Sequence, residues 1–412
     1  MVARVQRRGG RCLLPSLYIH IPFCERKCLY CDFYSVDRPE LIAGFLAALA
    51  QEIALRGHEY GSRTFQTVFF GGGTPSLLSP RQLEGILSRL RNNFRIAANA
   101  EITLEANPGT VNEESLRAFR ALGVNRVSIG IQSFRGEDLG FLGRIHTEAE
   151  ALRCIDLSRT AGFDNLGIDL IYSIPGQTLD QWEENLRIAV DLAPQHIAAY
   201  SLIIEEHTPL ARMVRSGEVH ANPTDHEARM YERTMEVLAA RGYEHYEVSN
   251  YALPGVRCRH NGAYWSHQDY LGLGPSAHSF RADAGGTIGE RWWNVADLSL
   301  YEARLQGDTP PVAGREQIGI REMVSERIFL GLRSGGVDLA GLAADLGYDL
   351  ATRQREMVRW MTEANLACAE GGILRLTAKG YLLCDEVCRR VLHEVTAGTD
   401  WPAAEEGDRR VS

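Results

Sequence analysis

The sequence predicts an α/β fold built on a partial (βα)6 barrel of the TIM type, followed by a smaller α-rich, winged-helix-like domain. Three observations lead to this prediction. Six short β-rich segments alternate with helical segments between residues 16 and 250. Glycine or polar residues follow each β-rich segment directly, as they do at the carboxyl end of a parallel barrel. After Pro310 and Pro311, the pattern changes to helices with one short β-ribbon.

The predicted strands are short runs rich in β-branched, aliphatic or aromatic residues, at residues 17–20, 67–70, 102–105, 126–130, 166–171 and 197–202. The segments between and after them have apolar residues at helical spacing, at residues 41–55, 80–93, 114–122, 148–160, 179–192 and 225–241. Strand–helix–strand units of this length give parallel strands joined by right-handed crossovers. Six such units in series favour a barrel, or part of one, over a short doubly wound sheet.

The chain divides into five parts. Residues 1–15 and 397–412 are tails that we expect to be disordered. Residues 16–250 carry the six βα units, and residues 251–310 form a connecting segment with little periodicity. Residues 311–396 form the C-terminal domain, with a strand-like stretch at 371–376.

Composition and charge exclude several classes of protein. The 412 residues include 44 Lys and Arg against 53 Asp and Glu, a net charge of −9. This balance argues against a general affinity for nucleic acid or anionic lipid. The most apolar stretch, residues 41–55, is too short to span a bilayer and contains Gln51 and Glu52. The basic start has no apolar core or cleavage site, so we expect a cytoplasmic protein.

Three of the nine cysteines, Cys24, Cys28 and Cys31, have C-x3-C-x2-C spacing directly after the first predicted strand. Such close spacing indicates an inorganic centre in a reducing compartment rather than a disulfide framework. A [4Fe–4S] cluster held by three cysteines leaves one iron free to bind a chelating substrate. Zinc is the alternative, with His20 or Asp32 as its fourth ligand.

The cysteine loop and the motifs behind it resemble the radical S-adenosylmethionine (SAM) superfamily. Gly71-Gly72-Gly73-Thr74-Pro75 follows the second predicted strand and resembles the family's glycine-rich motif, in which the backbone approaches the methionine amine of SAM. The resemblance implies a [4Fe–4S] cluster on Cys24, Cys28 and Cys31. It also implies a SAM site formed by Tyr18, Gly72, Gly73, Thr74, Glu105, Gln132, Arg144 and Asp169. The residue types suit SAM, because carboxylates accept hydrogen bonds from ribose or amine groups and an arginine pairs with a carboxylate.

Longer motifs resemble one branch of that superfamily over nearly the whole chain, namely the oxygen-independent coproporphyrinogen III dehydrogenases and their relatives. These motifs are YIHIPFC at 18–24, FGGGTP at 70–75, EANP at 105–108, GIQSF at 130–134, RIH at 144–146 and DLIYSIPGQT at 169–178. Two features depart from the dehydrogenases. Phe33 stands where they have a fourth cysteine, and the first predicted strand begins at about residue 17, without their longer N-terminal segment. In both features the chain resembles the HemW family of heme chaperones.

An H-N-x-x-Y-W motif is a further similarity to the heme chaperones, at His260, Asn261, Tyr264 and Trp265. The resemblance implies that these residues contact heme, with an imidazole for the iron and aromatic rings for the macrocycle. The remaining cysteines have a plainer interpretation. Cys384 and Cys388 are four residues apart on a predicted helix, so packing is the expected role for them.

The resemblance implies a heme chaperone that carries a [4Fe–4S] cluster, SAM and heme, and that delivers heme to hemoproteins of the respiratory chain. The alternative is an oxygen-independent coproporphyrinogen III dehydrogenase, which decarboxylates its substrate through a 5′-deoxyadenosyl radical. Less favoured are a radical SAM enzyme that opens the heme ring and an iron–sulfur regulator that binds DNA, since the chain is acidic and has no basic recognition helix. The sequence assigns no catalytic residue. A homodimer, and peripheral membrane association through the recipient, stay open.

Overall fold

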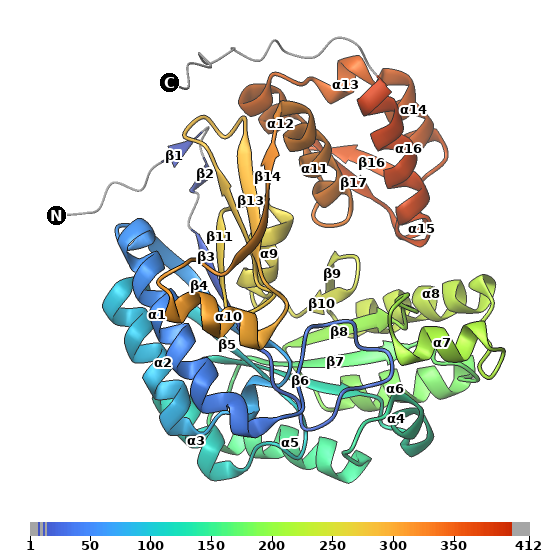
Figure 1. Cartoon of the computed structure of the whole chain (residues 1–412). Helices are drawn as coiled ribbons and strands as arrows, with labels where there is room; N and C mark the ends of the chain where they lie inside the picture. The colour runs from blue at the N-terminus through green and yellow to red at the C-terminus, as the bar shows by residue number, and fades with distance from the viewer. Residues whose placement is uncertain (1–6, 9–10, 13–14, 398–412) are drawn as a thin grey trace, which may run out of the picture.

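The computed structural model describes residues 7–8, 11–12 and 15–397. A twelve-stranded mixed sheet, covered by helices on one side, is joined to a C-terminal helical domain (Figure 1). The disorder expected for the two tails concerns residues that lie mostly outside the described ranges. Within the N-terminal tail, β1 (Arg7–Arg8) and β2 (Arg11–Cys12) pair in antiparallel fashion.

Six parallel strands form the centre of the sheet, and each pairs with the next one along the chain. They are β3 (Ser16–Ile21), β4 (Thr64–Gly72), β5 (Arg95–Ala106), β6 (Arg126–Gln132), β7 (Leu166–Tyr172) and β8 (His196–Ser201). The six predicted helices correspond to α1 (Ile42–Tyr60), α2 (Pro80–Asn93), α3 (Glu113–Ala121), α5 (Glu148–Thr160), α6 (Leu179–Asp191) and α8 (Thr224–Ala240). The predicted (βα)6 core is therefore confirmed. Two short helices, α4 (Gly136–Leu142) and α7 (Pro209–Arg215), were not predicted.

Four of these helices begin with the same hydrogen-bonding motif at the N-cap. Ser79, Asn112, Thr147 and Thr178 each accept a hydrogen bond from the backbone N–H three residues later, and the side chain at that position bonds back to the backbone of the cap. This capping box satisfies two N–H groups that the first turn leaves unpaired. The helix starts are thus fixed locally, and α2, α3 and α6 follow loops at the carboxyl ends of β4, β5 and β7, whereas α5 follows α4.

The barrel does not close among the described residues. Beyond β8 the sheet continues with the antiparallel strands β10 (Asn250–Ala252) and β9 (Glu244–Glu247). Beyond β3 it continues with β11 (Tyr270–Leu273), which is parallel to β3, and then with the antiparallel strands β12 (His278–Ala282), β13 (Gly289–Asn294) and β14 (Val312–Ile318).

The segment 251–310, which we expected to be a connector, is thus part of the main sheet. It also contributes α9 (Arg259–Trp265) and α10 (Leu298–Gln306). The sequence did not reveal these strands because they are short and mix Gly, His, Arg and Trp, so that no period of two stands out.

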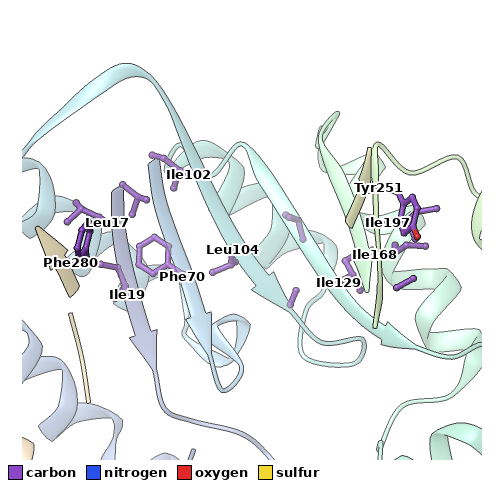
Figure 2. Packing of buried hydrophobic residues seen from close by; sticks show 14 of the residues in the cluster. Leu17, Ile19, Phe70, Ile102, Leu104, Ile129, Ile168, Ile197, Tyr251 and Phe280 are labelled. Carbon is purple, nitrogen blue, oxygen red and sulfur yellow. The ribbon is translucent and has the colours of Figure 1, made fainter. Parts of the chain in front are cut away.

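The two faces of the parallel strands differ in chemistry, because successive side chains point to opposite sides. One face is apolar and belongs to a single core cluster with the side chains of the surrounding helices. Figure 2 shows residues of this face, among them Leu17, Ile19, Phe70, Ile102, Leu104, Ile129, Ile168 and Ile197. The opposite face carries Tyr18, Phe69, Glu105 and Asp169, and it is the face on which the site forms.

The C-terminal domain combines short helices with a small antiparallel sheet of strand order β15-β17-β16. Its elements are α11 (Ile320–Leu332), β15 (Val337–Asp338), α12 (Leu339–Leu346), α13 (Leu350–Arg353), α14 (Arg355–Glu363), β16 (Ala367–Glu370), β17 (Ile373–Leu376), α15 (Ala378–Leu382) and α16 (Cys384–Ala397). An α-rich domain with a β-ribbon was predicted and is confirmed. Cys384 and Cys388 are buried on one face of α16, with their sulfur atoms 4.0 Å apart. Within the described part of the chain, every helix is too short or too polar to cross a bilayer.

Candidate functional site

A cavity of about 550 Å³, which we call the strand-end cavity, opens at the carboxyl ends of the parallel strands. It brings together all three residues of the cysteine motif and seven of the eight residues predicted to bind SAM. Its lining includes Cys24, Cys28, Cys31, Gly72, Gly73, Thr74, Glu105, Gln132, Arg144 and Asp169. Strand register explains the convergence, because Glu105 lies beside Ser128 and Asp169 lies beside Gly130 across parallel pairs. Paired residues of a sheet point to the same face.

The cysteine loop leaves β3 and returns to it. The backbone N–H of Cys24 donates to the carbonyl of Val36 at 3.0 Å, and Phe23 forms an isolated β-bridge with the same residue. These contacts close the loop and direct its thiols to the cavity. Burial raises the pKa of Cys24 and of Cys31.

The three thiols do not form a site for a single ion. No three His, Cys, Asp or Glu side chains in the described part of the chain converge as one metal ion requires. A [4Fe–4S] cluster has a different requirement, since each thiolate binds its own iron.

A chain of hydrogen bonds joins two of the cysteines. Thr74 Oγ1 donates to Cys24 Sγ at 3.6 Å, and Asn107 Nδ2 donates to Thr74 Oγ1 at 3.0 Å. At the other end, Arg144 Nη2 donates to Asn107 Oδ1 at 2.7 Å, while its Nη1 donates to Cys28 Sγ at 3.6 Å. This series of hydrogen bonds therefore holds Cys24 and Cys28 in a fixed position relative to each other.

Asn107 was not among the predicted site residues, although it bonds to two of them. Its signal in the sequence was its place in the EANP motif, two positions after Glu105 at the end of β5. Ser128 was also missed, and its hydroxyl donates to Asp169 Oδ1 at 3.1 Å. Ser128 lies in mid-strand, where a serine in a sequence is indistinguishable from a packing residue.

The glycines at the end of β4 are required by close contacts. A Cβ on Gly72, whose φ is +107°, would lie 2.6 Å from the His20 ring. A Cβ on Gly73 would lie 2.5 Å from the carbonyl oxygen of Phe23. His20 is itself held by a contact of 2.8 Å between its Nε2 and the carbonyl oxygen of Tyr34. The strand end therefore offers bare backbone to the cavity, as the predicted SAM contact requires.

Two buried carboxyl groups face the same space. Burial raises the pKa of Glu105 to about 8, and the nearby Asp169 adds to this, while the Gly72 N–H and Arg126 act against it. Burial also raises the pKa of Asp169 to about 6, against the effects of Arg126, Ser128 and Arg144. Because a nearby cation favours the ionised form of a carboxyl group, this pair suits a ligand that carries positive charge.

Tyr18 is the predicted SAM residue that does not line the cavity. Tyr18 lies close to the lining residue Glu105, because both side chains approach Gly71. A Cβ placed on Gly71 would be 3.0 Å from the Tyr18 ring and 3.2 Å from Glu105 Oε2. Its hydroxyl lies 3.2 Å from His20 Nδ1. Tyr18 therefore supports lining residues, and its direct contact with SAM stays a prediction.

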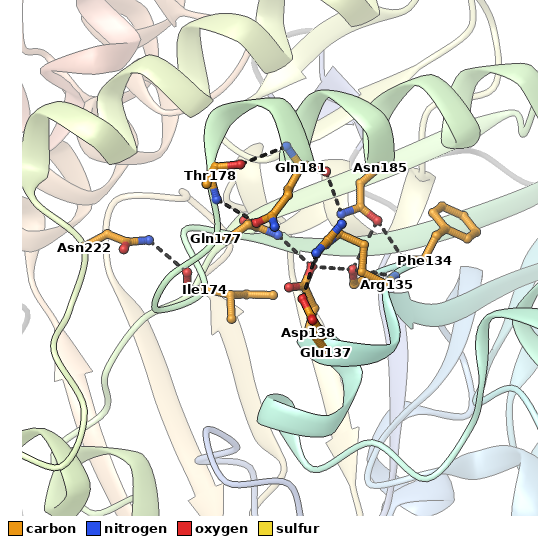
Figure 3. A network of polar contacts seen from close by, with 11 residues as sticks. Phe134, Arg135, Glu137, Asp138, Ile174, Gln177, Thr178, Gln181, Asn185 and Asn222 are labelled. Atoms are coloured by element: carbon orange, nitrogen blue, oxygen red, sulfur yellow. Dashed lines mark hydrogen bonds and ion pairs between the residues drawn. The ribbon is translucent and has the colours of Figure 1, made fainter.

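The loops around the cavity are braced by a second polar network, shown in Figure 3. Asp138 Oδ2 accepts from Ser133 Oγ at 2.7 Å and from Gln177 Nε2 at 2.9 Å. Asn185 Oδ1 accepts from the backbone N–H of Phe134 at 2.7 Å. These bonds tie the loop after β6 to the loop after β7 and to α6. They fix the position of Gln132, which precedes the network and has a φ of +69°.

The predicted heme motif lies on α9, and its histidine is inside the protein. His260 is 1% exposed, and its ring stacks on Phe69 with centroids 4.8 Å apart. Its Nδ1 lies 2.7 Å from Thr67 Oγ1, and its Nε2 lies 3.1 Å from the Tyr264 hydroxyl. Both ring nitrogens are thus occupied, so the structure does not present His260 to a ligand. Its role as an iron ligand stays a prediction that requires α9 to move.

The end of the motif is more accessible. Asn261, Tyr264 and Trp265 are half-buried, and Trp265 lines a second cavity, of about 340 Å³, between α9 and the C-terminal domain. Of the four predicted heme residues, only Trp265 lines this second cavity, and the strand-end cavity is lined by none of them. No residue lines both cavities.

Comparison with known proteins gives a consistent picture. Residues 18–189 match the Radical SAM superfamily, and residues 321–383 match the HemN C-terminal domain. The chain is 38% identical over 384 residues to the heme chaperone HemW of Mycobacterium tuberculosis, covering 92% of this chain and 94% of that one. It is 34% identical over 386 residues to HemW of Bacillus subtilis, covering 93% and 100%. The solved structure of coproporphyrinogen III oxidase (HemN) from Escherichia coli has the same fold, with a TM-score of 0.79, 23% identity and coverage of 95% and 91%.

Proposed function

The chain belongs to the HemW family of heme chaperones within the radical SAM superfamily, and on this premise we propose that it binds heme and delivers it to a hemoprotein of the respiratory chain, in the cytoplasm. The observation that carries the proposal is similarity to proteins named HemW along nearly the whole chain. A homodimer, and membrane association through the recipient, belong to the same proposal, and both can be tested by sedimentation with and without the recipient.

The family implies a [4Fe–4S] cluster and SAM, and the strand-end cavity fits both groups. We assign the cluster to Cys24, Cys28 and Cys31, with Arg144 and Thr74 donating hydrogen bonds to two of the sulfurs. When bound, the cluster and SAM supply one-electron chemistry.

The chain's own residues orient SAM in this proposal. Gly72 and Gly73 have no side chain, so SAM can lie directly against their backbone, while the carboxyl groups of Glu105 and Asp169 face its positive charge. Replacing Glu105 by Gln should weaken SAM binding and leave the visible spectrum of the cluster unchanged. Glu205→Gln is the matched control, because Glu205 lines the same cavity at an exposed position.

Position 33 supports a chaperone over a dehydrogenase. Phe33 stands where the dehydrogenases have a fourth cysteine, and its side chain is 66% exposed at the rim of the strand-end cavity. An exposed apolar ring offers packing surface and no redox chemistry. The structural match to HemN has 23% identity and shows a shared fold.

One experiment separates the two activities. The cluster is reconstituted anaerobically, and the full chain is assayed for heme binding, for heme transfer to an apo-hemoprotein of the respiratory chain, and for coproporphyrinogen III turnover. We expect heme to be bound and transferred, with no turnover. Turnover of coproporphyrinogen III without bound heme would reverse the assignment.

A further inference from the structure

The cavity of about 340 Å³ between α9 and the C-terminal domain, which we call the α9 cavity, is built from two parts of the chain. The end of α9 and the turn after it supply one wall, with Trp265 and His267. The end of α11, the glycine-rich turn that follows it and β17 supply the other wall, with Arg327 and Arg375. Arg257 stands beside α9 and completes the lining.

The α9 cavity is cationic in a chain that is acidic overall. Arg257, Arg327 and Arg375 line it, against Asp338, whose Oδ1 already accepts from the Gly341 N–H that begins α12. Arg375 is exposed and has no carboxylate partner among the described residues; its Nε donates to a backbone carbonyl at 2.9 Å. Arg375 is thus ready to receive an anionic oxygen at the entrance. Arg257 is 53% exposed beside it and pairs with Glu244 at 2.9 Å, so that an incoming carboxylate would share or replace this exposed ion pair.

Arg327 lies deeper in the α9 cavity and adds to its positive charge. Its side chain is 16% exposed, and its Nη1 pairs with Asp345 at 2.8 Å. Its Nε is buried and has no hydrogen-bond partner in the part of the chain that is described. A buried donor without a partner destabilises the protein unless something else satisfies it.

The opposite wall carries a second unpaired group. The His267 side chain is 5% exposed, with Nε2 at 2.9 Å from Glu326 Oε2, and its Nδ1 has no partner among the described residues. Its φ of +53° lies in the left-handed region, which is strained for a residue other than glycine. Buried unpaired nitrogens and backbone strain concentrate at sites that act on a ligand. This observation is independent of the arginines and points to the same space.

The lining therefore suits a flat apolar molecule that carries carboxylates along one edge. Arginine forks bind carboxylates through two parallel hydrogen bonds, and an indole packs against a flat ring. A cavity of about 340 Å³ holds the carboxylate-bearing edge of such a ligand, with the remainder lying against the mouth. We propose that the α9 cavity is the binding site for the propionate carboxylates of heme, which Arg257, Arg327 and Arg375 receive while the macrocycle packs on Trp265. The inference rests on the proposed function, because heme is its cargo.

The test compares heme with heme dimethyl ester, in which both carboxylates are blocked. Both are titrated into the full chain with its cluster reconstituted. The wild-type protein should bind heme about tenfold more tightly than the ester. In the double variant R257Q/R375Q, heme should lose most of its advantage over the ester, and Arg327, which the variant keeps, should account for what remains. The control is R389Q, since Arg389 is 70% exposed and pairs with Glu386 as Arg257 pairs with Glu244.

The outcomes separate the site from the function. Equal binding of heme and its ester by the wild-type protein would overturn the α9 cavity as the carboxylate site, and this comparison needs no variant. Full preference for heme in R257Q/R375Q would overturn it as well. Failure of the wild-type protein to bind either compound would instead contradict the proposed function.

Discussion

The sequence and the structure indicate different roles for the side chain of His260. In the sequence it opens an H-N-x-x-Y-W motif, and in the structure it fills the interior beneath the strand-end cavity. Its ring joins Thr67 on β4 to Tyr264 on α9 and stacks on Phe69. The motif was visible in the sequence, but the burial was not, because α9 reaches the sheet only through a long-range contact.

Replacing His260 by Ala should therefore destabilise the protein by about 2–4 kcal/mol, since it leaves a cavity and two unpaired hydroxyls. Urea unfolding of the heme-free chain measures this. Asn261→Ala is the control, because Asn261 is half-buried on the same helix and should cost less. Unchanged stability in His260→Ala together with lost heme binding would show instead that His260 meets the heme directly.

Glu105 and Asp169 give a pH dependence whose sign follows from their environment. Both have a raised pKa in the folded chain, about 8 and about 6, so the folded state holds protons that the unfolded state releases. The contribution of these two groups to stability is therefore largest at low pH and falls as the pH rises toward these values. Of the two, only Glu105 titrates between about pH 6 and 8. Glu247, whose pKa burial raises to about 7, contributes with the same sign, whereas buried histidines with a lowered pKa, such as His20 and His245, contribute with the opposite sign.

For the chain without SAM, we expect the melting temperature of the wild type, relative to that of Glu105→Gln, to fall from pH 6 to pH 8. The comparison isolates the contribution of Glu105, because glutamine does not ionise and the other titrating groups are common to both proteins. Differential scanning calorimetry at several pH values provides the measurement, and Glu205→Gln serves as the control. An equal slope in the wild type and in Glu105→Gln would show that Glu105 does not titrate in this range.

At the scale of elements, the predicted strands and most helices agree with the structure, because period and capping are local properties. Ser79 and Thr178 begin helices at the predicted places, for example. Strands such as β11 and β13, outside the six βα units, were not predicted, since they contain Gly or Trp where an alternating pattern would be needed. The partner that joins β11 to the parallel strands, β3, is also distant in sequence. The candidate site was largely predicted, because its residues lie at the ends of predicted parallel strands.

A series of hydrogen bonds runs from Cys24 through Thr74, Asn107 and Arg144 to Cys28, and it links the segments that follow β3, β4, β5 and α4. Asn107→Ala should keep all three cysteines but break this link, so that the cluster is lost about tenfold faster in air, as when a supporting partner of a metal ligand is removed. Decay of the visible absorbance and the iron content follow the loss. Asn99→Ala, at an exposed position on β5, is the control. Equal decay rates would mean that the cysteine loop needs no support from β5.

At the scale of the whole molecule, the two candidate binding cavities are separate. The strand-end cavity and the α9 cavity share no lining residue, and the stack of Tyr18, Phe69 and His260 lies in the interior of the sheet. Each cavity also has its own source of charge. The buried Glu105 and Asp169 face the strand-end cavity, whose lining also includes Arg144, whereas the α9 cavity is lined by three arginines and Asp338. A protein that holds a cationic cofactor and an anionic cargo at once benefits from this separation, because unlike ligands do not compete for one site.

This separation predicts that heme affinity does not depend on the cluster. The variants Cys24→Ala, Cys28→Ala and Cys31→Ala should each lose the brown colour and the iron of the cluster, yet bind heme within about threefold of the wild type, a difference of less than 1 kcal/mol. Because coupling between two binding sites is reciprocal, added heme should likewise leave SAM affinity unchanged. Spectroscopic titration of each variant with heme measures the first expectation, and SAM binding with and without heme measures the second. Loss of heme binding in all three variants would indicate that heme binds beside the cluster, in the strand-end cavity whose rim carries Phe33. It would contradict heme binding at the α9 cavity.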